Sequence, residues 1–130
     1  SQVLQKTEDG KRLSTDRLQH LKDARTILEN YALGQHHSSA IPYYHLSRVH
    51  LSQVRVFWRQ WKSEPNKEEN FEELFSQIDQ QLRLSLQRWR RAEALDTQHR
   101  IQQELINLRQ RIEEHRVAWD AHIVGTSILM

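Results

Sequence analysis

The sequence of 130 residues contains no cysteine, only three glycines and only two prolines. Without cysteine there are no disulfides, no thiol catalysis and no zinc sites built on thiolates. So little glycine and proline argues against all-β folds, which need turn residues about every 8–12 positions, and against glycine-rich phosphate loops. No apolar run approaches the roughly 20 residues of a transmembrane helix, and no secretory signal is visible. We therefore expect one soluble, cytoplasmic domain over residues 1–130 that makes no membrane contact.

Apolar residues recur at steps of three and four along most of the chain, which predicts amphipathic helices. We expect an all-α bundle of three to four helices, and the predicted segments are residues 14–33, 42–63, 69–95 and 97–123. Residues 1–13 are polar and aperiodic, and we expect them to form a loose tail, with a short C-terminal tail at 125–130. The last two segments are either antiparallel helices or one long kinked helix. The lack of glycine and proline between them favours continuity.

Several residues predict where the helices begin and end. Ser14 or Thr15 is expected to cap the first helix, and Gly34 to end it in the left-handed conformation. Pro42 suits the first turn of the second helix, and Asn70 can cap the third. The second segment carries two apolar stripes, which indicates that it packs on two sides and forms the centre of the fold. Pro65 and Asn66 are expected to end that segment.

Eight histidines raise the question of a metal site. His45 and His50 are five residues apart and do not share a helical face, whereas His115 and His122 share a face two turns apart. A carboxylate-bridged di-metal bundle needs two Glu-x-x-His motifs, and the sequence has none. Its paired carboxylates fit helix starts and solvated faces, and nothing matches a nucleophile elbow. We therefore expect no metal, no cofactor and no enzymatic activity.

The formal charge of +2 is the sum of separate basic and acidic segments of the chain. Residues 43–63 carry four cations of one helical stripe and no acid, whereas residues 64–79 hold six acids and a single lysine. Residues 83–111 then carry seven arginines against three acids. Arginine pairs with phosphate, and tryptophan beside it can stack on bases. The candidate residues for such contacts are Arg48, Arg55, Arg59, Lys62, Arg88, Arg90, Arg91, Arg109, Arg111 and Arg116.

Three interpretations of this pattern stay open. The basic surface contacts single-stranded nucleic acid or an acidic peptide, as a non-catalytic accessory factor would. Alternatively, all four tryptophans lie on apolar stripes as core residues and the arginines are solvated or paired with acids. In the third interpretation the chain is a protein–protein adaptor, a chaperone or a small subunit of a larger assembly, with self-association expected. Convergence of Arg88, Arg91, Arg109 and Arg111 on one surface would favour nucleic acid, whereas scattered or acid-paired arginines would favour the adaptor.

Residues of the later helices resemble PriC, the family of bacterial primosomal replication-restart proteins. The resemblance covers about residues 43–120, and it rests on Leu46, Gln53-Val54, Arg59, Phe71-Glu72, Gln98, Ile101, Glu104, Arg111-Ile112, Arg116 and Ala118. It implies an accessory protein of DNA replication that binds single-stranded DNA and the acidic tail of the single-strand-binding protein. It also implies an anionic partner for Arg88, Arg91, Arg109, Arg111 and Arg116. Residues 51–55 are in addition similar to the helical small subunits of CRISPR effector complexes.

Overall fold

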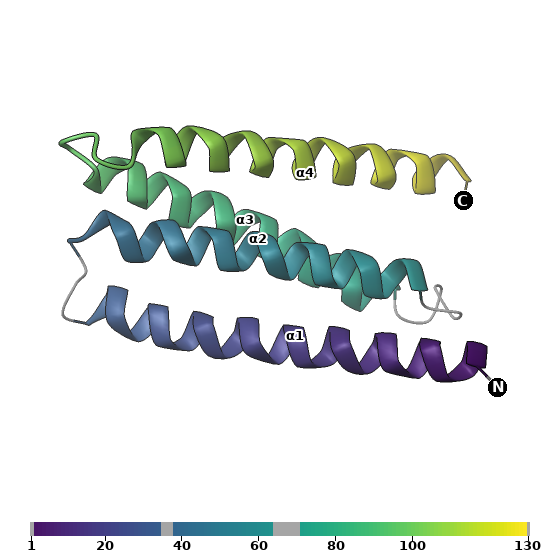
Figure 1. Cartoon of the computed structure of the whole chain (residues 1–130). Helices are drawn as coiled ribbons and strands as arrows, with labels where there is room; N and C mark the ends of the chain where they lie inside the picture. Colours follow the sequence, from purple (N-terminus) through teal and green to yellow (C-terminus); the bar gives the residue numbers. More distant parts are fainter. Residues whose placement is uncertain (1, 35–37, 64–70, 130) are drawn as a thin grey trace.

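The computed structural model describes residues 2–34, 38–63 and 71–129, which fold into helices with no strand among them. Successive helices run in opposite directions (Figure 1). The four helices are α1 (Gln2–Leu33), α2 (Ala40–Ser63), α3 (Phe71–Leu95) and α4 (Gln102–Leu129). The predicted all-α architecture is confirmed, and the last two segments are separate antiparallel helices.

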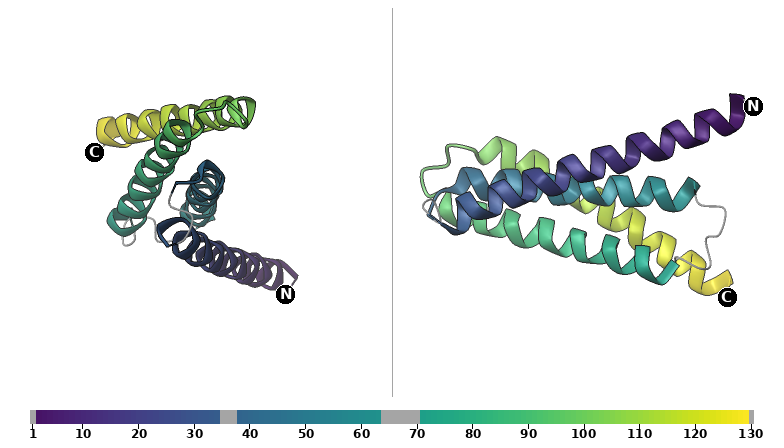
Figure 2. Two further views of the ribbon diagram at one scale, coloured as in Figure 1. Left: turned by 90° about the vertical axis from the view of Figure 1, so that its left-hand side faces the viewer. Right: turned by 90° about the horizontal axis from the view of Figure 1, so that it is seen from below.

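The helices form an open arrangement in which α2 is central (Figure 2). Helix α3 packs along α2, α1 packs on another side of α2, and α4 packs on α3 and touches α2 only lightly. Within the described residues, α1 contacts neither α3 nor α4. One face of α2 therefore stays uncovered between α1 and α4, which lie on either side of it in Figure 1.

The core lies mainly where α2 meets α3 and where α3 meets α4. Leu46, Ile78, Leu108 and Ile112 are among the largest fully buried side chains. Each such aliphatic side chain stabilises the fold by about 1.5–3 kcal/mol relative to an exposed position. Both apolar stripes of α2 contribute buried residues, so the predicted packing on two sides is confirmed: Leu46, Leu51, Val54, Val56 and Phe57 are buried.

A buried polar layer joins α2 to α3. The Ser47 hydroxyl donates to the Ser85 carbonyl oxygen at 2.6 Å. His50, which is fully buried, has its Nδ1 at 2.6 Å from Oε1 of Gln81. Because a carboxamide oxygen only accepts, Nδ1 carries the proton in this contact. Buried hydrogen bonds of this kind fix the register of two packed helices, since a shift would leave each group unpaired.

His50 is held neutral by its surroundings. Burial lowers the pKa of His50 below its usual range, and the nearby Arg88 of α3 and Arg25 of α1 lower it further. The hydrogen bond with Gln81 and the Glu29 carboxylate act in the opposite direction and are outweighed. The folded protein therefore takes up a proton at this ring less readily than the unfolded chain does.

Acidification from pH 7 to pH 5 is expected to destabilise the fold for this reason. The contribution of His50 is complete above the ordinary histidine pKa of about 6.5 and declines below it, by at most about 1.4 kcal/mol per pH unit. Urea denaturation at both pH values checks this, and His50→Gln should lose less stability on acidification than the wild type. The stability of His50→Gln should still depend on pH to some extent, because burial and Arg48 also lower the pKa of His45. An equal loss in His50→Gln and in the exposed control His20→Gln would contradict the role of His50.

Three predictions about α1 are wrong. Residues 2–13 are helical, so they form no loose tail, and Ser14 and Thr15 lie inside α1 and cap nothing. The segment is rich in good helix formers, which extend a helix without an apolar stripe. Gly34 has no positive φ; the reason for a glycine is space, because a Cβ there would lie 2.7 Å from the Asn30 carbonyl oxygen.

The other boundary predictions have mixed outcomes. Pro42 lies in the first turn of α2, as predicted. Helix α4 reaches Leu129, so residues 125–129 are helical and form no separate tail. The proposed helix ends at Pro65 and Asn66 and the proposed cap at Asn70 lie outside the described residues.

The predicted continuity between α3 and α4 is wrong, and Asp96 explains the break. Its carboxylate accepts hydrogen bonds from the backbone N–H groups of Arg100 at 2.9 Å and Ile101 at 3.1 Å. These groups precede α4 and would otherwise lack acceptors. His99 adopts a left-handed backbone conformation with φ of 54° and redirects the chain. A carboxylate cap and one left-handed residue thus replace the glycine or proline that usually marks such a turn.

Asp96→Ala is expected to lower the free energy of unfolding by about 1–2 kcal/mol, because two backbone donors lose their acceptor. Asp96→Asn should cost less, since its amide oxygen still accepts one of the two bonds. The midpoint of urea denaturation, followed by circular dichroism, measures both losses. The same midpoint in Asp96→Ala and the wild type would show that water replaces the cap at no cost.

Candidate functional site

A groove of about 390 Å³ lies between α2 and α4 and combines positive charge with aromatic surface. We call it the basic groove, and its lining residues are Val54, Arg55, Trp58, Arg59, Lys62, His115, Ala118 and Trp119. No acidic residue lines it. Its lining residues come from α2 and α4 alone.

The spacing of its cations explains why they share the groove. Arg55, Arg59 and Lys62 follow one another at steps of four and three, so they lie on one face of α2. At about 1.5 Å per residue, the Cα atoms rise by roughly 6 Å and 4.5 Å along the helix. All three are exposed, and none forms an ion pair within the described part of the chain. The whole of α2 lacks acidic residues, so no intrahelical partner neutralises them.

Trp58 and Trp119, which line the groove, belong to a cluster of aromatic rings from three helices. Trp58 of α2 meets Trp119 of α4 edge to face, with ring centroids 5.2 Å apart. His122 lies 4.9 Å from Trp58 and 4.5 Å from Trp61 by the same measure. Phe75 of α3 contacts Trp119 at 5.2 Å. This cluster fixes the position of Trp58 and holds α4 against α2 where the two helices otherwise touch little.

Trp58 has an apolar side and an accessible side. It is half-buried, and the Lys62 ammonium lies 5.4 Å from the centroid of its ring. A cation over an indole face is held electrostatically, and at a solvated site this contact contributes only about 0.5–1 kcal/mol. An incoming anion can therefore draw Lys62 away at little cost and leave the indole face free to stack.

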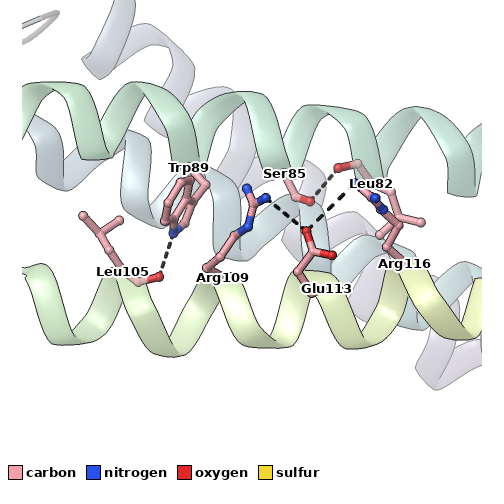
Figure 3. A network of polar contacts seen from close by, with 7 residues as sticks. All are labelled: Leu82, Ser85, Trp89, Leu105, Arg109, Glu113 and Arg116. Atoms are coloured by element: carbon pink, nitrogen blue, oxygen red, sulfur yellow. Dashed lines mark hydrogen bonds and ion pairs between the residues drawn. The ribbon is translucent and has the colours of Figure 1, made fainter.

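The predicted arginines of α3 and α4 do not join this groove. Arg109 lies 5.0 Å from the ring centroid of Trp89 and pairs with Glu113 at 3.1 Å (Figure 3). Arg116 approaches the same Glu113 carboxylate at 3.9 Å. These two guanidinium groups are thus engaged with an acid of their own helix rather than of a neighbouring one, and such acid pairing favours the adaptor interpretation.

The remaining candidate cations have other surroundings and do not line the basic groove. Arg91 lies 5.8 Å from the ring centroid of Tyr43, and Arg48 lies 5.7 Å from that of Tyr44. Arg88 has a buried Nε without a hydrogen-bond partner among the described residues, so it belongs to the helix interface. The last two, Arg90 and Arg111, are exposed and do not line the basic groove. Of the ten predicted cations, only Arg55, Arg59 and Lys62 line the basic groove.

The α4 wall of the groove was missed by sequence reasoning. His115 and Trp119 belong to the regular apolar stripe of α4, which predicts core positions. Trp119 is indeed buried, and it lines the groove with its remaining surface. Ala118 was singled out only as part of the resemblance to PriC, not as a residue of a groove. Nothing in the pattern of either helix indicates that α4 crosses near Lys62 of α2.

Across residues 2–34, 38–63 and 71–129, no three or more histidine, aspartate or glutamate side chains gather as they would around a metal ion. Within those same ranges, no helix has the length and apolar character required to cross a bilayer.

Comparison with known proteins found no relative of this chain. No family model matches the sequence, and neither a curated protein nor a solved structure matches the chain.

Proposed function

We propose that this chain is a non-catalytic accessory protein that binds single-stranded nucleic acid in the basic groove. The observation that carries the proposal is the groove itself, where Arg55, Arg59 and Lys62 lie beside Trp58 and no acidic residue is found in the lining that the described residues form. Guanidinium and ammonium groups neutralise phosphates, and aromatic faces stack on unpaired bases without regard to sequence. A duplex buries its base faces, so Trp58 favours a single strand.

The resemblance to PriC points in the same direction and stays a prediction. Among the residues that carry it, Val54, Arg59 and Ala118 line the basic groove. The family's partners, single-stranded DNA and an acidic protein tail, share the negative charge that this groove would attract. The arginines that the resemblance would assign to the anionic surface lie elsewhere, on α3 and α4. We therefore base the proposal on α2.

Binding of a fluorescent 12-nucleotide single strand, measured by anisotropy at 50 and 200 mM salt, tests the proposal. Three phosphate contacts predict a salt slope of about −2 for a single strand, which is about a 20-fold loss of affinity over this range. A duplex of the same sequence should bind more weakly than the single strand at 50 mM. Absence of binding at 50 mM would overturn the proposal.

An adaptor role is the second candidate, and exposed apolar residues favour it. Ile27 and Val117 are 68% and 65% exposed, and Ile41 and Ile106 are 54% and 51% exposed. Apolar side chains left open to solvent on a small protein often become interfaces. This role predicts a stable dimer or a tight complex with an acidic peptide, together with weak binding to the oligonucleotide. A monomeric mass by light scattering combined with oligonucleotide binding would exclude it.

A further inference from the structure

A second, smaller pocket of about 170 Å³ lies between α1 and α2. We call it the arginine pocket, and its lining residues are Arg17, Leu21, Ser52, Arg55, Val56 and Arg59. Arg17 comes from α1, and the other two arginines come from α2. Three guanidinium groups of two helices thus share one pocket.

Nothing in the described structure neutralises these three charges. No acidic residue lines the pocket, and none of the three arginines forms an ion pair among the described residues. Like charges that line one pocket repel one another, and an anion bound between them would reduce that repulsion. Arginine forms paired N–H···O bonds with phosphate oxygens, and the Ser52 hydroxyl supplies one more donor or acceptor.

The arginine pocket is continuous with the basic groove through shared residues. Arg55 and Arg59 line both, so a strand that follows the groove across α2 reaches the pocket. An internal phosphodiester carries one negative charge, whereas a phosphate monoester carries about −1.5 to −2 at neutral pH and presents three acceptor oxygens. Three guanidinium groups match the monoester better than the diester.

We propose that the arginine pocket binds the terminal phosphate monoester of the strand that occupies the basic groove, an inference that rests on the proposed function. The protein then recognises phosphorylated ends of single strands in addition to their length. Arg17 is the residue specific to this step, because it lines the pocket and does not line the groove.

Three 12-nucleotide strands of one sequence test this proposal: one with a 5′ phosphate, one with a 3′ phosphate and one with hydroxyl groups at both ends. We expect one of the phosphorylated strands to bind about 10-fold more tightly than the hydroxyl-ended strand, as for one added charge-assisted contact. In Arg17→Gln this ratio should fall below about two-fold. Lys22→Gln is the matched control, because it removes one exposed positive charge from α1 outside the pocket and should keep the ratio.

Measurements with inorganic phosphate distinguish a site for the end of a strand from a site for free phosphate. It should compete with the phosphorylated strand, and at matched ionic strength it should raise the Tm of the wild type more than that of Arg17→Gln. Equal binding of all three strands would overturn the inference and leave the proposed function standing. Phosphate-dependent stabilisation without any strand binding would overturn both and identify a site for free phosphate. If Arg17→Gln still prefers the phosphorylated strand, the terminal phosphate binds outside the arginine pocket and the inference is overturned.

Discussion

Replacing Arg55, Arg59 and Lys62 together by glutamine is expected to weaken single-strand binding by about 100-fold at 50 mM salt. Each of the three cations loses a charge-assisted phosphate contact, and a loss of about 1 kcal/mol per contact already gives this factor. The salt slope should become shallower by about 2, because three fewer counterions are released. Anisotropy titrations of the 12-nucleotide strand at several salt concentrations measure both quantities.

A second triple variant separates the groove from general positive charge. Arg90, Arg100 and Arg111 are exposed on or between α3 and α4, and none of them lines the basic groove. Their replacement by glutamine removes the same three charges, so a nonspecific electrostatic attraction would weaken by the same factor. We expect less than a 5-fold loss in this variant, since only long-range attraction changes and salt screens it beyond about 10 Å. Equal losses in the two variants would contradict a binding site on α2.

The part of this site that sequence can predict is the part that lies on one helix. Positions 55, 59 and 62 share a face by spacing alone, and the absence of acids from α2 leaves them unpaired whatever the tertiary structure. The opposite wall depends on how α4 crosses α2, and no spacing within either helix contains that information. Arg17 was missed for the same reason, because only the packing of α1 on α2 brings it beside Arg55.

The fold shows the same division between local and tertiary information. The apolar stripes of α2 and α3 predicted buried residues such as Leu46 and Ile78, and both are buried. The sequence left open whether α3 and α4 are separate, because the break depends on a carboxylate that caps Arg100 and Ile101 and on a left-handed histidine. Those signals are conformational, and a scan for glycine and proline does not detect them.

Trp119→Ala is expected to lower the free energy of unfolding by about 3–5 kcal/mol, the usual cost of truncating a buried aromatic residue. Trp119 is 5% exposed and its ring contacts Trp58 of α2 and Phe75 of α3. Truncation leaves a cavity that other side chains fill only in part, because α4 makes few other contacts with α2. Urea denaturation measures the loss, and the m value shows whether unfolding stays two-state.

Trp119→Phe is the control that separates ring packing from hydrogen bonding. The Nε1 atom of Trp119 has no hydrogen-bond partner among the described residues, so phenylalanine removes ring area and no bond. Trp89→Phe differs in this respect, because Nε1 of Trp89 donates to the Leu105 carbonyl oxygen at 2.7 Å, and its loss should add about 1 kcal/mol. Equal losses in the two phenylalanine variants would contradict this difference.

The same variants test whether the α4 wall shapes the groove. If Trp119 holds α4 against α2, Trp119→Ala should weaken single-strand binding even at a temperature where the variant remains folded, whereas Trp119→Phe should retain binding. Binding by folded Trp119→Ala equal to that of the wild type would mean that α2 alone forms the binding surface. The cations of α2 would then suffice, and the groove between the helices would be incidental to recognition.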